Sequence, residues 1–279
     1  NAALLAEHDI RFEPGLNEEL AATAMRGTQQ IDWFGQPRVD GVFALWYAKG
    51  VGVDRACEAI KQANFEGTAR HGGALLLAGD DHAAKSSLTA HQSEHTLIAG
   101  FVPVLYPATT EDMLRMGQLG FALSRFSGLY VGMKAVTDTL DLTSTARLPG
   151  TDFPITMPEP PAGVQLNLWQ GMTALQQEEL VLSHRLPAAQ AFARANRMDR
   201  LVRGEKGARL MIVSAGKAWL DLMQALDDLG LDDDRCRSLG IGVAKLGLVW
   251  PLEPDFARDT CLGAQEVLVV EEKRPVIED

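Results

Sequence analysis

The sequence is poor in cysteine, in basic charge and in long apolar runs, and each shortage excludes a class of protein. Cys57, Cys236 and Cys261 form no CxxC pair, which indicates a reducing compartment and excludes a complete Cys-ligated cluster within this chain. The formal net charge of -11 argues against a nucleic acid or an anionic membrane as partner. No apolar run approaches the roughly 18 residues that span a bilayer, and no secretory leader is recognisable. We therefore expect a cytoplasmic protein.

Short apolar runs alternate with longer amphipathic ones over the first half of the chain. Strands are predicted near residues 40–47, 74–78, 102–106 and 129–136, and helices over 17–31, 54–64 and 110–125. Asn17 and Thr110 are the expected N-caps of two of these helices. Because strand and helix alternate, the pattern indicates an α/β fold with a parallel sheet covered on both faces.

A second α/β unit follows a proline-rich stretch. Five prolines fall between residues 149 and 161, so residues 141–172 are predicted to be an exposed linker between domains at 1–140 and 173–279. The second unit is predicted to contain helices over 174–201 and 217–229 and strands over 209–214, 242–249 and 267–271. Since the chain starts at Asn1 inside what reads as a helix tail, we expect it to be a fragment of a longer protein.

The most informative stretch is Gly79 to His95, GDDHAAKSSLTAHQSEH. It places acids, imidazoles, a lysine and hydroxyls directly after the apolar run Ala74 to Ala78, at the expected carboxyl end of a buried strand, where α/β folds carry their chemistry. We call residues 79–95 the signature block. It resembles the signature loop of the indolepyruvate ferredoxin oxidoreductases, a family of thiamine-diphosphate-dependent 2-oxoacid:ferredoxin oxidoreductases. Further segments resemble the large single-chain form of that enzyme: GTQQIDWFGQPRVDGVFALWYAKG (27–50), SRFSGLYVGMKAVTDT (124–139), LPAAQAFARANRMDR (186–200) and EVLVVEEKRPVIED (266–279).

The resemblance implies a fold, a reaction and partners. It implies two parallel-sheet domains: a pyrimidine-type thiamine-diphosphate-binding domain at 1–140, incomplete at its amino end, and a transketolase C-terminal-like domain at 173–279. The implied reaction is the oxidative decarboxylation of aryl 2-oxoacids such as indolepyruvate to acyl-CoA, with ferredoxin as electron acceptor. Coenzyme A, ferredoxin, the remaining domains of the same enzyme and a homo-oligomer are the implied partners. The family holds the diphosphate and Mg²⁺ through a GDG-type motif, which this chain lacks, so these and the iron-sulfur clusters are expected elsewhere.

Glu18 is the expected catalytic and cofactor-binding residue. In the resembling family, an acid in the first turn of a helix is followed by a glycine nine places on, and Gly27 selects Glu18 rather than Glu19. A carboxylic acid at this position shares a proton with the pyrimidine ring nitrogen of the cofactor, and burial would raise its pKa to suit that task. The alternative interpretation is an acid that favours the positive end of a helix.

Within the signature block, His82, Lys85, Ser86 and Ser87 are expected to face the substrate, where a carboxylate and a developing oxyanion need donors. Arg125 is an alternative carboxylate clamp. The competing interpretation is that the acids cap a helix, the serines satisfy loop backbone and the histidines are merely exposed.

Other motifs predict other functions. HQSEH, His91 to His95, matches HxxEH, in which two histidines one helical turn apart grip zinc and Glu94 serves as base; Glu178 or Glu179 would supply a third ligand. A phosphate loop is excluded because Ala84 stands where glycine is required, and GVGVDR and GIGVAKLG are expected to be ordinary turns. A non-catalytic interaction subunit of the same fold is a further alternative. We assign Lys217, Trp250 and residues 271–274 mainly to packing and assembly.

Overall fold

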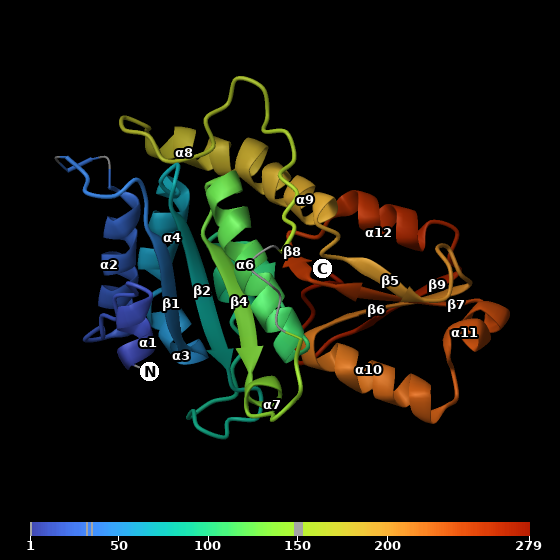
Figure 1. Ribbon diagram of the computed structural model, residues 1–279. Helices are drawn as coiled ribbons and strands as arrows, with labels where there is room; N and C mark the ends of the chain where they lie inside the picture. Colours follow the sequence, from blue (N-terminus) through green and yellow to red (C-terminus); the bar gives the residue numbers. More distant parts are fainter. Residues whose placement is uncertain (1, 32, 35, 148–152) are drawn as a thin grey trace.

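The computed structural model describes residues 2–31, 33–34, 36–147 and 153–279, and the chain builds two sheets (Figure 1). The first sheet has the strand order β1-β2-β4-β3-β8 and the second has the order β5-β7-β6-β9. The first contains β1 (Phe43–Lys49), β2 (Gly73–Asp80), β3 (Val104–Leu105), β4 (Val131–Val136) and β8 (Leu248–Trp250). The second contains β5 (Arg200–Arg203), β6 (Leu210–Ala215), β7 (Ile241–Leu246) and β9 (Glu266–Val270).

Helices cover both faces of the first sheet, which explains why its central strands are mostly apolar. On one face lie α2 (Glu18–Gln29) and α4 (Cys57–Glu66), whose buried residues pack with alternate residues of β1 and β2. The other face is covered by α6 (Thr110–Ser127), which packs with the intervening residues of β2 and β4. The side chain that caps α6 is Thr109 rather than the predicted Thr110, because Thr109 is the residue with extended backbone that accepts from Asp112 N.

The remaining helices connect the strands. In the first half they are α1 (Ala2–Glu7), α3 (Gly50–Arg55), α5 (Glu94–Ala99) and α7 (Thr137–Leu140). In the second half they are α8 (Ala174–Leu180), a π-helical turn (Val181–Arg185), α9 (Leu186–Ala195), α10 (Gly216–Asp228), α11 (Asp233–Leu239) and α12 (Pro254–Cys261). Among the described residues, no helix is both long and apolar enough to cross a bilayer.

The prediction of an α/β fold with two mainly parallel sheets is confirmed, with two antiparallel additions. β1, β2, β4 and β3 are parallel, as are β7, β6 and β9. β5, which the sequence pattern assigned to the end of a helix, pairs antiparallel with β7. The predicted single strand 242–249 is wrong, since it divides at Gly247 and its second part, β8, pairs antiparallel with β3 in the first sheet.

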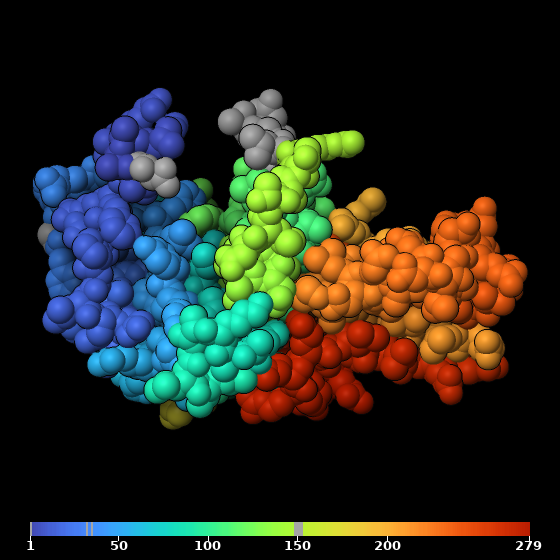
Figure 2. All heavy atoms as spheres, turned by 90° about the horizontal axis from the view of Figure 1, so that it is seen from below, coloured from blue at the N-terminus to red at the C-terminus, as the bar shows by residue number. Residues whose placement is uncertain are grey.

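The carboxyl ends of β1, β2 and β4 share one edge of the first sheet, which faces the viewer in Figure 2. The chain segments that follow these strands gather there: α3, the signature block and α7. The start of α10 and the C-terminal residues 271–279 lie beside them. In the predicted linker, Pro149 lies outside the described residues, and residues 153–173 form neither helix nor strand.

Candidate active site

Glu18 begins α2 at this carboxyl edge. Asn17 caps the helix by accepting from Leu20 N at 2.9 Å, and the indole of Trp46 donates to the backbone oxygen of Glu18 at 3.1 Å. The Glu18 side chain is 38% exposed, and its Oε2 lies 3.9 Å from Arg55 Nε. Its carboxylate therefore stands at the same edge as the signature block and keeps room for a ligand, whereas Glu19 is exposed on the helix surface.

A glycine in α3 makes room for Glu18. A Cβ placed on Gly52 would lie 2.5 Å from Glu18 Cγ, closer than side chains tolerate. A Cβ on Gly50, two residues earlier, would lie 2.0 Å from His91 Nδ1. The segment GVGVDR is therefore a helix, and its two glycines leave room for Glu18 and His91. The prediction of an ordinary turn at this segment is wrong. At Gly27, by contrast, a Cβ would meet nothing within 4 Å in this chain.

His91 is held between two carboxylates. Its Nε2 lies 2.7 Å from Asp54 Oδ2 and its Nδ1 lies 3.3 Å from Asp80 Oδ1. Burial lowers the pKa of His91, but the hydrogen bonds to Asp54 and Asp80 outweigh it and leave the pKa raised. Because both ring nitrogens face acceptors, the geometry favours the imidazolium form. His91 thus anchors the end of the signature block to α3.

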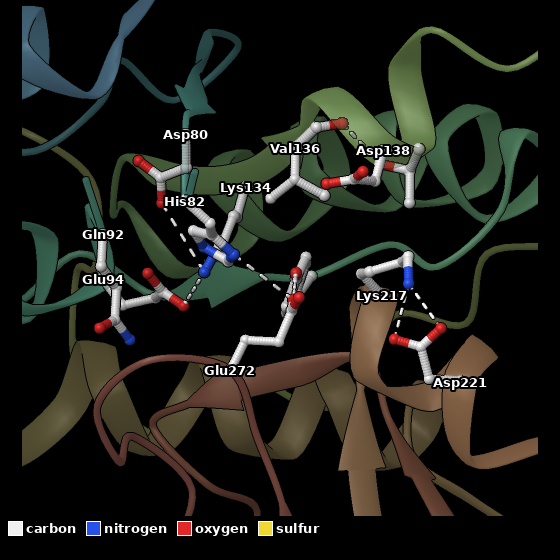
Figure 3. A network of polar contacts seen from close by, with 12 residues as sticks. Asp80, His82, Gln92, Glu94, Lys134, Val136, Asp138, Lys217, Asp221 and Glu272 are labelled. Atoms are coloured by element: carbon white, nitrogen blue, oxygen red, sulfur yellow. Dashed lines mark hydrogen bonds and ion pairs between the residues drawn. The ribbon is translucent and has the colours of Figure 1, made fainter. Parts of the chain in front are cut away.

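A buried lysine completes this anchor (Figure 3). Lys134 lies in β4 with a side chain only 1% exposed, and its Nζ contacts Glu94 Oε1 and lies 3.7 Å from Asp80 Oδ2. The ring of Tyr106 covers the same ammonium at 4.6 Å. Sequence reasoning missed Lys134, although a lysine inside a strand buried on both faces signals a buried acidic partner.

Asp81 holds the loop of the signature block together. Its carboxylate accepts from Lys85 N at 2.8 Å and from Ser86 N at 2.6 Å, and these bonds lower the pKa of Asp81. Asp81 thus closes a loop and does not cap a helix. The competing interpretation of Asp81 is therefore wrong. Lys49 Nζ holds the loop from outside by donating to Ser86 O. The turn leaves Lys85 and Ser86 exposed at the carboxyl edge and Ser87 half-buried.

Arg125 lies apart from the other candidates. Its Nη2 donates to His71 O at 2.9 Å and its guanidinium stacks on the Phe43 ring at 4.5 Å. His71 precedes β2 and Phe43 begins β1, so Arg125 lies at the amino edge of the sheet. The hypothesis that it clamps the same ligand as the signature block is therefore wrong.

The zinc hypothesis also fails on geometry. His91 lies ahead of α5 and bonds two aspartates, while Glu94 is paired with Lys134, so the two histidines do not share a helical turn. Within the described ranges, no group of three or more His, Cys, Asp and Glu side chains is placed to hold a metal ion.

Sequence comparisons find one family model that matches the C-terminal part of the chain, and similar proteins over its whole length. Residues 199–279 match the family model of the indolepyruvate ferredoxin oxidoreductase middle domain. The indolepyruvate oxidoreductase subunit IorA of Methanothermobacter thermautotrophicus is 24% identical over 273 residues, covering 96% of this chain and 40% of that protein. IorA of Pyrococcus abyssi is 23% identical over 292 residues, covering 100% of this chain and 41% of that protein. The chain therefore spans about two fifths of these relatives.

Solved structures show the same fold. The 2-oxoglutarate:ferredoxin oxidoreductase from Magnetococcus marinus, with 2-oxoglutarate, coenzyme A and succinyl-CoA bound, superposes with a TM-score of 0.62 at 16% identity, covering 96% of this chain and 51% of that one. A split-gene transketolase superposes with a TM-score of 0.53 at 13% identity, covering 96% and 68%. The chain is thus similar to the indolepyruvate oxidoreductase subunits over its length and to the indolepyruvate ferredoxin oxidoreductase middle domain over residues 199–279, and it shares the α/β fold of the 2-oxoglutarate:ferredoxin oxidoreductase and of the split-gene transketolase.

Proposed function

We propose that this chain is part of a thiamine-diphosphate-dependent oxidoreductase that oxidatively decarboxylates aryl 2-oxoacids, indolepyruvate among them, with ferredoxin as electron acceptor and an acyl-CoA as product. The relationship to IorA supports the reaction class. One observation carries the proposal: the Glu18 side chain packs against Gly52, at the same edge of the sheet as the signature block.

The residues around Glu18 suit the pyrimidine ring of thiamine diphosphate. When bound, this cofactor supplies a nucleophilic carbon for addition to the keto group of the substrate. Glu18 keeps an oxygen free for a ring nitrogen, because the described residues offer its carboxylate no partner nearer than Arg55 at 3.9 Å. A hydrogen-bonded acid here can hold and return the proton that activates the ring. We assign the diphosphate, Mg²⁺ and the iron-sulfur clusters to other domains, since the chain has neither a GDG motif nor a CxxC pair.

We assign substrate binding to the signature block. Lys85, Ser86 and Ser87 supply an ammonium and two hydroxyls at the carboxyl edge, and such donors stabilise a carboxylate and a developing oxyanion. His82 lies at the base of the same loop. The buried contacts of Asp80 with His91 and Lys134 fix the position at which the loop leaves β2. Rigid support of this kind preserves the geometry of a binding loop.

The proposal is tested with the full-length enzyme that carries this sequence. Reduction of a viologen dye is measured with indolepyruvate, thiamine diphosphate, Mg²⁺ and coenzyme A, and compared with reduction driven by 2-oxoglutarate. We expect kcat/KM to favour indolepyruvate by about tenfold or more, the discrimination of pocket contacts worth ~1.4 kcal/mol. Activity that does not require thiamine diphosphate contradicts the reaction class, and equal or better use of 2-oxoglutarate contradicts the aryl substrate.

A further inference from the structure

The C-terminal residues 271–279 fold back from the second sheet onto the signature block. Glu271 closes a turn by accepting from the backbone N–H groups of Val276, Ile277 and Glu278, at 3.0, 2.8 and 3.2 Å. The Gln92 side chain then holds Arg274 by both backbone groups, donating to its oxygen at 3.0 Å and accepting from its nitrogen at 3.0 Å. These contacts fix Glu272, one of the two residues between them, beside the first sheet.

Glu272 is fixed by Tyr106. The Tyr106 hydroxyl donates to Glu272 Oε2 at 2.8 Å. The ring of Tyr106 fits over Gly216, where a Cβ would lie 2.2 Å from its Cζ. Burial raises the pKa of Glu272, but hydrogen bonds with His82 and Tyr106 outweigh it and leave the pKa lowered. Glu272 therefore carries a negative charge at neutral pH, on the side of the signature block.

One ring nitrogen of His82 faces the Glu272 carboxylate. Its Nδ1 lies 3.5 Å from Glu272 Oε2, and its side chain is only 11% exposed. Its Nε2 is buried and has no hydrogen-bond partner among the described residues. An imidazole with a carboxylate at one nitrogen and the other nitrogen unpaired has a fixed orientation and a nitrogen available to a ligand.

We propose that Glu272 is a positioning residue for His82, so that the second domain completes the substrate site that the signature block begins. When both of its ring nitrogens carry a proton, His82 donates from Nε2 to the carboxylate or keto oxygen of the bound 2-oxoacid. Glu272 stabilises the positive charge and keeps the other proton on Nδ1. This inference rests on the proposed function and adds a residue that the sequence pattern assigned to packing.

Other charged groups surround the pair, as Figure 3 shows. Lys134 and Asp80 face it from the first sheet, Glu94 from α5, Asp138 from α7, and Lys217, paired with Asp221, from α10. Carboxylates and lysines ordinarily titrate about two or more pH units from imidazole. A limb of the pH profile near neutrality therefore reports a histidine rather than these neighbours. A change at Glu272 acts on His82, which it faces, whereas His91 bonds Asp54 and Asp80 instead.

The test compares Glu272→Gln with Glu271→Gln in the full-length enzyme. Gln at 272 keeps the shape but removes the charge that stabilises the His82 imidazolium. We expect kcat/KM for the 2-oxoacid to fall by about tenfold or more, and the basic limb of its pH profile to move to lower pH. Glu271→Gln changes the adjacent carboxylate, which bonds only backbone, and should leave that limb unchanged. A limb at the wild-type pH in Glu272→Gln overturns the proposal.

Two further measurements separate this proposal from the proposed function. Above the basic limb, ¹⁵N NMR of the wild-type enzyme should show His82 with its proton on Nδ1; a proton on Nε2 overturns the pairing even if the enzyme shows no 2-oxoacid activity. The double variant His82→Gln/Glu272→Gln should be no less active than His82→Gln alone, because Glu272 acts through His82. Losses that multiply overturn the positioning role, whereas an inactive wild type with the Nδ1 proton in place counts against the proposed function alone.

Discussion

At the scale of single residues, the contact between Glu18 and Gly52 decides where the proposed catalytic acid lies. In Gly52→Ala, the new Cβ would lie 2.5 Å from Glu18 Cγ and 2.8 Å from Ala48 Cβ, so the flexible Glu18 has to move. A displacement of about 1 Å can cost roughly 100-fold in rate. We expect 2-oxoacid-dependent dye reduction to fall by about 10- to 100-fold, together with a loss of thermal stability, because Ala48 Cβ is fixed by the backbone of β1 and cannot rotate away.

Gly117→Ala is the matched control for this substitution. Gly117 also lies inside a helix, but a Cβ there meets nothing within 4 Å. Alanine in a helix interior is favoured over glycine by about 1 kcal/mol, so Gly117→Ala should keep full activity and unfold at the same or a slightly higher temperature. Full activity in Gly52→Ala would show that Gly52 does not position Glu18.

Asp199 predicts a dependence of stability on pH. Burial raises the pKa of Asp199 to about 6 from 3.8, against hydrogen bonds to its Oδ1 from Gly247 N and Leu248 N. The folded state therefore binds this proton more tightly than the unfolded chain, so Asp199 lowers the free energy of unfolding as pH rises from about 4 to 6.

Asp199→Asn keeps an oxygen to accept both bonds and removes the charge. We expect this variant to be more stable than the wild type above pH ~6, by about 1 to 3 kcal/mol, with the difference vanishing near pH ~4. Urea unfolding at a series of pH values measures it. A variant that is less stable than the wild type at neutral pH would show that the ionised Asp199 stabilises the fold.

At the scale of elements, one arginine ties the predicted linker to helix α4. Arg185, in the π-helical turn, is fully buried and donates to Leu166 O at 2.6 Å, Phe65 O at 2.9 Å and Glu66 O at 3.0 Å. These bonds satisfy the carboxyl end of α4 and the linker together. Burial lowers the pKa of Arg185 to about 10, so the side chain remains charged at neutral pH.

Arg185→Met should destabilise the protein because it leaves these buried carbonyls without donors. Each unsatisfied group costs about 1 to 3 kcal/mol, so we expect a loss of about 3 to 5 kcal/mol in the free energy of unfolding. Arg237→Met is the control, since Arg237 forms only half-exposed pairs within α11 and should cost less than about 1 kcal/mol. Equal denaturant midpoints for the two variants would refute the role of Arg185.

The central elements could be predicted from the sequence because their periodicity is strong. β2 is a short apolar run between glycines, and α6 shows helical spacing over its whole length. The division of β7 from β8 could not be predicted, because the run from Ile241 to Trp250 is apolar on both sides of Gly247. Its second part pairs with β3 only in the packed fold. Short helices such as α5 and α11 contain too few turns to show a period.

The position of the candidate site in the fold was predictable where a motif marked it, while the roles of its residues stay predictions. The signature block follows β2 at the carboxyl edge that the strand pattern predicts, and Glu18 contacts Gly52 of α3, which follows β1 at the same edge. Lys134 could have been found from the sequence, because it is a charged residue inside an apolar strand. The contact of His82 with Glu272 could not be seen in the sequence, because residues so far apart along the chain meet only through the packing of the two sheets.

At the scale of the whole molecule, the two halves share a core. β8 pairs with β3, and Val249 and Val213 join the apolar cluster that contains Leu76. The division into domains at 1–140 and 173–279 stays a prediction. Because residues 1–172 alone would expose the surface that β8 covers, we expect that fragment to bind the dye ANS and to unfold without cooperativity. Cooperative unfolding near the temperature of the longer chain would contradict a shared core.

The most direct test of the account is dye reduction by the full-length enzyme with indolepyruvate, for wild type, Glu18→Gln and Glu19→Gln. Gln at 18 keeps the shape but cannot share the proton, so we predict a loss of about 100-fold or more, the worth of general acid-base assistance. Glu19, exposed on the same first turn, should tolerate the same change with wild-type activity. Wild-type activity in Glu18→Gln would contradict the account and favour a non-catalytic interaction subunit of this fold.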